Sequence, residues 1–145
     1  MTTAVLDTNV LASGFASQTA DSIPAKVLDA WRARLFTLAV SEHILSELAR
    51  TFSQPWFRRR LSPDQVAADL ALLRRQTTVT PITTQVHGVA THPEDDLVLA
   101  TALSAEAEYL VTGDSKLQKL GSYQCVTILS PRAFLELIIN EQQNS

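Results

Sequence analysis

The sequence contains a single cysteine, Cys125, among its 145 residues. One cysteine excludes an internal disulfide and a zinc site built from thiolates, and it is typical of a reducing compartment. No apolar run is as long as a transmembrane helix, because Glu106 and Glu108 interrupt the longest candidate. The first residues also lack the basic segment that opens a signal peptide. We therefore expect a cytoplasmic protein with no membrane partner.

The sequence also has few glycines and histidines and no excess of positive charge. The four glycines form no phosphate-binding loop, and no serine lies in a nucleophile elbow. The histidines, His43, His87 and His92, are not spaced as zinc ligands, and we expect a solvent-exposed or capping role for each. The net charge of −3 argues against binding of nucleic acid through overall charge. It does not exclude a nuclease, because an acidic metal site lowers the net charge while a separate basic patch holds the nucleic acid backbone.

The sequence does contain an ordinary share of apolar residues. Hydrophobic residues make up 46% and charged residues 19%, which at this length predicts one domain over residues 1–145 with its own core. Short apolar runs alternate with helical patterns, as they do in βαβ units. These features predict an α/β fold built on a parallel sheet.

Local patterns place the expected strands and helices. Apolar runs predict strands at residues 3–6, 36–40, 79–82, 109–112 and 125–129. Serines suited to be N-caps begin helices at Ser22, Ser41, Ser62 and Ser130. Further helices are predicted at 94–105 and 115–120, a loop is predicted at 85–93, and Pro55 breaks the helical pattern.

Apolar residues at helical spacing predict which helix faces are buried. In chain order they are Val27, Leu28, Trp31, Leu35, Ile44, Leu45, Leu48, Phe52, Val66, Leu70, Leu73, Phe134, Leu135, Ile138 and Ile139. The helix at 94–105 is apolar on nearly every face, so we expect it to be buried.

Four acidic residues carry the strongest functional signal. Asp7 and Asp114 each follow a short apolar run, as residues do at the carboxyl end of a parallel strand, and ligands bind at that edge of open α/β sheets. Glu47 and Asp95 lie on predicted helices. Carboxylates brought together at one edge repel one another unless they share a hard cation such as Mg²⁺ or Mn²⁺. The pattern therefore predicts a metal site, and the hypothesis is metal-assisted hydrolysis of phosphodiesters.

Each acid also has a purely structural explanation. Asp7 suits a turn or an N-cap, and Asp114 suits the N-cap of the next helix. Asp95 lies in the first turn of a helix, where the dipole favours carboxylates, and a helical glutamate such as Glu47 is usually solvated. Taken singly, each structural explanation is at least as good as the functional one. Taken together, the four positions favour a metal site.

Three segments carry these acids in a characteristic order. They are Leu6-Asp7-Thr8-Asn9 after an N-terminal strand, Ser41 to Leu48 with Glu47, and Asp95 to Ala102 followed by Tyr109 to Asp114. In order, type and overall length they resemble the PIN-domain nucleases, particularly the VapC-like toxins of bacterial toxin–antitoxin systems. The resemblance covers about half of the chain, with nothing diagnostic between Thr51 and Val89. It implies a three-layer α/β/α PIN-like domain with a central, mainly parallel sheet.

The resemblance also implies roles for individual residues. The catalytic carboxylates that bind one or two Mg²⁺ or Mn²⁺ ions, directly or through water, would be Asp7, Glu47, Asp95 and Asp114. Waters and carboxylates would be positioned by Thr8, Asn9 and Thr112. Asp96 is either a further acid near the ion or a residue of the helix start, and we favour the latter. Many relatives have an acid two positions after the last aspartate. Lys116 stands there instead, which either weakens a second ion site or provides a phosphate contact.

The activity implied by the resemblance is that of an endoribonuclease acting on single-stranded or loop RNA. Such a toxin would have a separate antitoxin protein as its partner and would form a homodimer through the C-terminal helix or the Val66 helix. Two alternatives stay open: a PIN-like nuclease of RNA processing without a toxin role, and a non-catalytic RNA- or protein-binding module with the same fold. A phosphatase of the haloacid dehalogenase type is a poor alternative, because Asn9 stands where a second aspartate is needed.

Residues 56–60 form the only dense basic stretch, Trp-Phe-Arg-Arg-Arg. Arginines beside aromatic residues can hold phosphates and stack on unpaired bases. We expect Trp56 and Phe57 to pack on the core instead. For Arg58, Arg59 and Arg60, an RNA-binding role and a solvated surface are equally good interpretations.

Overall fold

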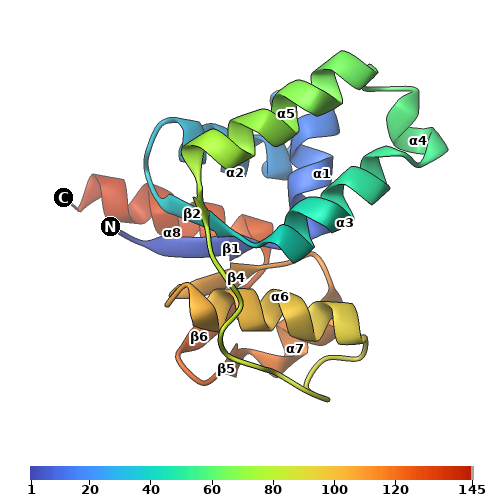
Figure 1. The fold of residues 1–145 in the computed structure, drawn as a ribbon. Coiled ribbons are helices and arrows are strands. Elements are labelled where there is room, and N and C mark those ends of the chain that lie inside the picture. The colour runs from blue at the N-terminus through green and yellow to red at the C-terminus, as the bar shows by residue number, and fades with distance from the viewer. Residues whose placement is uncertain (145) are drawn as a thin grey trace.

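The computed structural model describes residues 1–144, and its centre is a six-stranded sheet with the order β3-β2-β1-β4-β6-β5 (Figure 1). The strands are β1 (Thr3–Leu6), β2 (Thr37–Val40), β3 (Thr78–Val79), β4 (Tyr109–Val111), β5 (Ser122–Tyr123) and β6 (Val126–Leu129). Neighbouring strands are parallel except β5 and β6, which are antiparallel. The prediction of a mainly parallel sheet is therefore confirmed.

Helices cover both faces of this sheet. They are α1 (Thr8–Ala16), α2 (Ile23–Arg32), α3 (Glu42–Phe52), α4 (Pro55–Arg58), α5 (Pro63–Gln76), α6 (Pro93–Ser104), α7 (Ser115–Leu120) and α8 (Pro131–Gln143). In Figure 1, α1, α2, α3 and α5 lie on one side of the sheet and α6 lies on the other. This is the three-layer α/β/α arrangement. Among the described residues, no helix is long and apolar enough to cross a membrane.

The four predicted serine N-caps are confirmed. The hydroxyl oxygens of Ser22, Ser41, Ser62 and Ser130 accept the N–H three residues later in α2, α3, α5 and α8. At α5 the Gln65 side chain also accepts the Ser62 N–H, which completes a capping box. Each serine satisfies an N–H that would otherwise lack a partner in the first helical turn.

Several local predictions are wrong. Residues 8–16 form α1 although no helix was predicted there. Pro55 does interrupt the helical pattern as predicted, because α3 ends at Phe52, but it also begins the short α4, which was not predicted. A proline is tolerated in the first turn of a helix, where its missing N–H has no partner to lose. β3 covers only residues 78–79, and the two-residue edge strand β5 has too little sequence for a pattern.

The predicted buried faces are too wide at the edges of the helical layers. Ile139 is 44% exposed, and Leu135 is only half-buried, so α8 buries just Phe134 and Ile138. In α6, Leu97 is 40% exposed. Three more of the predicted core residues, Leu35, Val66 and Leu70, are half-buried. Periodicity identifies the centre of an apolar stripe, but the neighbouring elements decide how far burial extends across it.

The core fixes the sheet edge at which the acids emerge. Ala4, Val5 and Leu6 of the central strand β1 are fully buried. Leu6 pairs with Val111 of β4, so both strands end at the same level. The Asp7 N–H continues the pairing by donating to the Val111 carbonyl oxygen at 2.8 Å. The residues that follow β1 and β4 therefore leave the sheet next to each other.

Replacing Gly14 of α1 by alanine is expected to destabilise the protein by about 1–3 kcal/mol through overpacking. An added Cβ would lie 2.5 Å from Leu28 Cδ1 and 2.9 Å from the Pro24 carbonyl oxygen of α2. This clash outweighs the better helix propensity of alanine, which is worth ~1 kcal/mol. Urea denaturation measures the free energy of unfolding. Gly113→Ala is the control, because no atom lies within 4 Å of its added Cβ. Equal stability of the two variants would contradict close packing of α1 on α2.

Candidate metal centre

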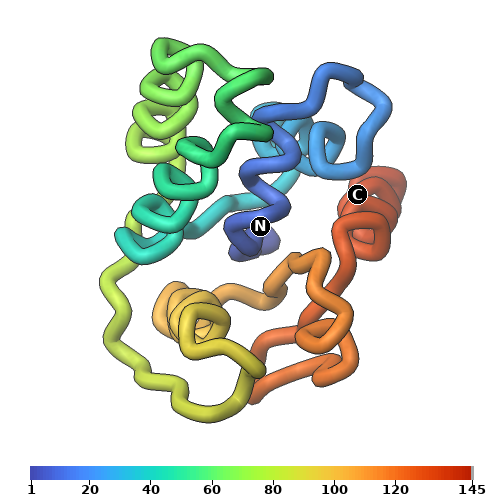
Figure 2. Tube along the Cα trace, turned by 90° about the vertical axis from the view of Figure 1, so that its right-hand side faces the viewer, coloured from blue at the N-terminus to red at the C-terminus, as the bar shows by residue number. Residues whose placement is uncertain are grey.

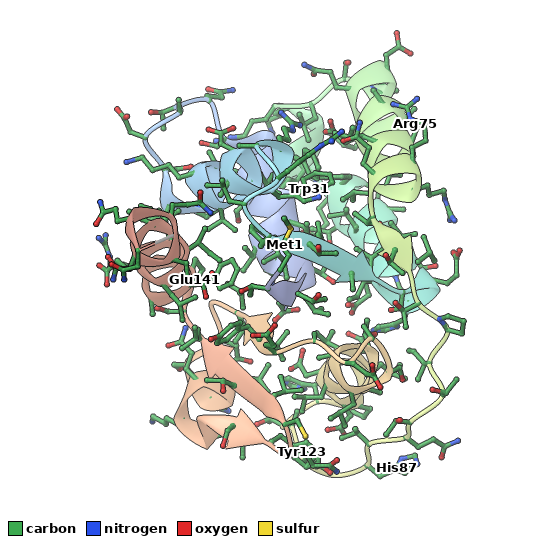
Figure 3. All side chains as sticks on the ribbon, turned by 90° about the vertical axis from the view of Figure 1, so that its left-hand side faces the viewer. Met1, Trp31, Arg75, His87, Tyr123 and Glu141 are labelled. Carbon is green, nitrogen blue, oxygen red and sulfur yellow. The ribbon has the colours of Figure 1, made fainter. Side chains whose placement is uncertain are left out.

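The four predicted acids emerge from elements that meet at the carboxyl edge of the sheet. Asp7 follows β1 and caps α1, Asp114 follows β4 and caps α7, Glu47 lies in the second turn of α3, and Asp95 lies in the first turn of α6. Figure 2 views the molecule from this side, with α1, α3 and α6 arranged around the end of β1. Met1, at the opposite end of β1, faces the viewer in Figure 3.

Asp7 is the most buried of the four, with 7% of its surface exposed. Its Oδ1 accepts the Thr8 N–H, and its Oδ2 accepts the Thr112 hydroxyl, each at 2.8 Å. Burial raises the pKa of Asp7 above its ordinary value, these two hydrogen bonds oppose the increase, and the charge of Asp114 adds to it. The carboxylate is thus held in one orientation while its own charge is poorly solvated.

Glu47 is tied to the same place by a second threonine. The Thr8 hydroxyl donates to Glu47 Oε1 at 2.9 Å. Thr8 therefore holds Asp7 through its backbone N–H and Glu47 through its hydroxyl. His43 Nε2 lies 3.4 Å from the same Oε1. Burial raises the pKa of Glu47, Thr8 and His43 lower it, and the neighbouring Glu94 side chain raises it.

Asp95 and Asp114 complete the group. Burial, followed by the charges of Asp7 and Asp114, raises the pKa of Asp95 to about 6. Asp114 is half-exposed, and its Oδ1 accepts the Lys116 N–H at 2.8 Å. Its own N–H donates to the Thr112 hydroxyl oxygen at 3.1 Å, so Thr112 bridges Asp7 and Asp114. The four carboxylates therefore act on one another electrostatically.

A divalent cation fits this group in ligand type and in charge. All four donors are carboxylate oxygens, which Mg²⁺ and Mn²⁺ prefer, and a shared cation would relieve the repulsion that raises the pKa of Asp95. Within residues 1–144, no three His, Cys, Asp or Glu side chains are arranged as they stand to hold one ion. Binding would therefore require these side chains to reorient around the ion.

Four other predicted site residues lie in different surroundings. Thr8 and Thr112 are buried and contact the acids, whereas Asn9 is exposed on α1. Lys116 is exposed in the first turn of α7 and lines a small hollow of about 40 Å³ with Asp114.

Asp96 is not simply a residue of the helix start, as was favoured from the sequence. It is buried, and its carboxylate accepts the backbone N–H groups of Gly88, Val89 and Ala90 at 3.0, 3.2 and 2.7 Å. The side chain thereby holds the loop before α6. Adjacent positions in one helical turn point to different surroundings, and the sequence could not show which neighbours each would meet.

Two residues near the acids were missed as site residues in the sequence. His43 contacts Glu47 from one turn earlier in α3, and Glu94 precedes Asp95 and acts on the pKa of Glu47. The spacing of four between His43 and Glu47 was an available signal, because residues i and i+4 share a helix face. The expected solvent or capping role of His43 is therefore wrong.

The basic stretch lies on and after α4, beyond the end of α3 (Figure 1). Trp56 is 48% exposed, so its predicted packing on the core is wrong, whereas Phe57 is half-buried and packs edge-on against Phe52. The Arg60 guanidinium lies 3.6 Å from the Trp56 ring centroid and donates to the Trp56 carbonyl oxygen. Arg58 and Arg59 are exposed.

Comparisons with known proteins identify a family and a solved structure with a similar fold. The family model described as PIN domain matches residues 3–116. The crystal structure of VapBC2 from Rickettsia felis bound to a DNA fragment from their promoter contains a similar chain. The TM-score is 0.60 at 16% identity, over 88% of this chain and 98% of that chain. At that identity the likeness shows the fold alone. No curated protein matches the chain.

Raising the pH from about 4 to about 7 in the presence of chelator is expected to destabilise the wild-type protein relative to Asp95→Asn. The folded protein keeps the Asp95 proton up to pH about 6, whereas the unfolded chain releases it near pH 3.8. Over this window the unfolded chain binds fewer protons, so rising pH favours unfolding. The difference is about 1 kcal/mol once solvent screening of this part-exposed group is included. Urea denaturation at both pH values measures it, and a pH-independent difference would contradict the raised pKa.

Asp96→Asn is expected to lower the free energy of unfolding by about 1–3 kcal/mol. The amide would present N–H groups to at least one of the three backbone donors that the carboxylate now accepts. Hydrogen exchange at Gly88, Val89 and Ala90 should become faster in the variant. Asp64→Asn, an exposed change in the first turn of α5, is the control. Unchanged exchange at the three amides would show that Asp96 does not hold this loop.

Proposed function

The chain belongs to the PIN-domain family, and from this premise we propose that it is a metal-dependent endoribonuclease that hydrolyses phosphodiester bonds in single-stranded or loop RNA. The observation that supports this activity best is the convergence of Asp7, Glu47, Asp95 and Asp114 at one sheet edge. Two buried threonines orient the first two of them. A group of repelling carboxylates is costly for a fold and is explained by the cation that it would bind.

The four carboxylates would hold one or two Mg²⁺ or Mn²⁺ ions. When bound, such an ion supplies Lewis-acid chemistry by lowering the pKa of water and polarising a phosphoryl oxygen. Thr112 and Thr8 keep the carboxylates of Asp7 and Glu47 in place through the hydrogen bonds described above. Lys116, in the position where an acid would strengthen a second ion site, is assigned to a phosphate of the substrate.

Asp95 is the residue best suited to accept a proton from the attacking water. Within residues 1–144 no hydrogen bond is donated to its carboxylate, so its oxygens keep lone pairs that can accept a proton. Asp7 is less suited, because both of its oxygens already accept hydrogen bonds from the protein. Asp96 is unsuited for the same reason.

RNA would follow the exposed cationic side chains on the α4 side of the molecule. Arg58 and Arg59 are free of the stacking contact that holds Arg60 on Trp56, so they are the better candidates for phosphate contacts. Arg60 supports this surface by keeping the exposed Trp56 ring in a defined orientation. The ring could then stack on an unpaired base.

The physiological role that we propose is that of a VapC-like toxin with a separate antitoxin as its partner. The similarity in fold to a chain of the VapBC2 structure supports this role. A homodimer is proposed through α8, on which Ile139 is exposed, with α5 as the other candidate surface.

Purified protein is expected to cut single-stranded RNA in Mn²⁺ or Mg²⁺, and chelator should abolish the cutting. Asp7→Asn should lower the rate by at least ~100-fold, since it removes one anionic ligand of the ion. Products from a mixed set of single-stranded and structured RNAs are separated by gel electrophoresis. Asp64→Asn, which removes an exposed aspartate of α5, should cut like the wild type. Absence of both cutting and Mn²⁺ binding in the wild type would favour the non-catalytic binding module.

A further inference from the structure

His43 connects the two helices that carry Glu47 and Asp95. Its Nε2 lies 3.4 Å from Oε1 of Glu47 on the same helix, α3. The same nitrogen lies 3.2 Å from the backbone carbonyl oxygen of Glu94, in the first turn of α6. Glu94 is directly followed by Asp95, so one ring nitrogen contacts an acid and the segment that carries another.

The chemistry of the two partners determines the hydrogen on this nitrogen. A carbonyl oxygen only accepts hydrogen bonds, and an ionised carboxylate does the same. Nε2 must therefore be the donor. Its N–H makes a hydrogen bond with the Glu94 carbonyl oxygen, and Glu47 Oε1 lies beside it, 3.4 Å from the same nitrogen. In the neutral ring this requires the tautomer with the hydrogen on Nε2.

The ring is held for this contact and is not a mobile surface group. The His43 side chain is only 16% exposed, and Glu47 is 15% exposed. Ser41 begins α3 with its hydroxyl as the N-cap, so the first turn that presents His43 has a defined backbone. The Ser41 hydroxyl oxygen also accepts the Thr101 hydroxyl of α6 at 2.8 Å, which joins α3 and α6 a second time.

We propose that His43 is a positioning residue that acts through its Nε2–H. Its hydrogen bond to the Glu94 carbonyl oxygen ties the start of α6 to α3 beside the Glu47 carboxylate, at the relative position that a shared divalent cation requires. This inference rests on the proposed function, because it assigns Glu47 and Asp95 to one ion site. Groups that orient metal ligands in this way change metal affinity by about 10–100-fold when they are removed.

Two substitutions of His43 separate the donor from the ring. His43→Gln places its amide nitrogen the same number of bonds from Cβ as Nε2, so it can still donate to the Glu94 carbonyl oxygen. His43→Asn reaches only as far as the other ring nitrogen and loses the contact. His87→Asn, in an exposed position of the loop before α6, controls for the loss of any histidine.

The measurement is the dissociation constant for Mn²⁺ of the full chain at neutral pH, from the electron paramagnetic resonance signal of free Mn²⁺. We expect His43→Asn to weaken binding by at least ~10-fold, and His43→Gln and His87→Asn to stay within about threefold of the wild type. Thermal unfolding in chelator checks that each variant is folded. Rescue by glutamine is the result that a merely structural role of the ring would not give.

The outcomes separate this inference from the proposed function. If the wild type binds Mn²⁺ and His43→Asn binds it equally well, His43 does not position the ligands and the nuclease proposal stands. If His43→Gln is as weak as His43→Asn, the shape or charge of the ring matters and the Nε2–H does not. If the wild type binds no Mn²⁺, the proposed function fails as well. Long-range ¹H–¹⁵N spectra of the metal-free protein give an independent test, since neutral His43 with its hydrogen on Nδ1 would overturn the inference by itself.

Discussion

The parallel pairing of β1 with β4 is the constraint on which the acidic centre depends. Leu6 pairs with Val111, and the Asp7 N–H extends that pairing by one residue. Asp7 and Thr112 therefore leave the sheet together, close enough for the threonine hydroxyl to reach the carboxylate. A slip of one residue would turn every side chain of β1 to the opposite face and disrupt the packing of the fully buried Ala4, Val5 and Leu6. The packing of the core thus determines where the first carboxylate lies.

Burial at this edge has an electrostatic consequence. A carboxylate that is removed from water without a compensating partner resists ionisation, and the raised pKa values of Asp7, Glu47 and Asp95 all have burial as their largest cause. Threonine hydroxyls offset part of this cost at Asp7 and Glu47. The packing of the rest of the fold offsets the remaining free-energy cost of burying these carboxylates, and its strands β1 and β4 are almost completely buried. A cation would remove that remainder, so the same repulsion that weakens the metal-free protein would favour metal binding.

The features that could be predicted from the sequence are those that depend on residues within one helical turn or one strand. The caps Ser41 and Ser62 and the strand ends before Asp7 and Asp114 depend on residues close by, and they were predicted correctly. Helix α1 was missed because Gly14 weakens its helical pattern, and the close approach of Leu28 explains the glycine only in three dimensions. The contact between His43 and Glu94 joins residues 51 positions apart, beyond the reach of any local pattern. The family resemblance supplied the grouping of the four acids that local patterns could only suggest.

Asp95 and Asp96 show why residue type alone does not identify a site. Both are aspartates in the first turn of α6, where the helix dipole favours either one. Three backbone N–H groups satisfy Asp96, and it serves to hold a loop. Within residues 1–144 no hydrogen bond is donated to the Asp95 carboxylate, and burial together with the charges of three other acids raises its pKa. A cation binds where the protein leaves negative charge uncompensated, so the donors around a carboxylate separate a structural aspartate from a candidate ligand. By the same reasoning, Glu47 accepts one hydroxyl hydrogen bond, from Thr8, while the His43 Nε2–H donates to the Glu94 carbonyl oxygen, and the Glu47 charge stays available to an ion.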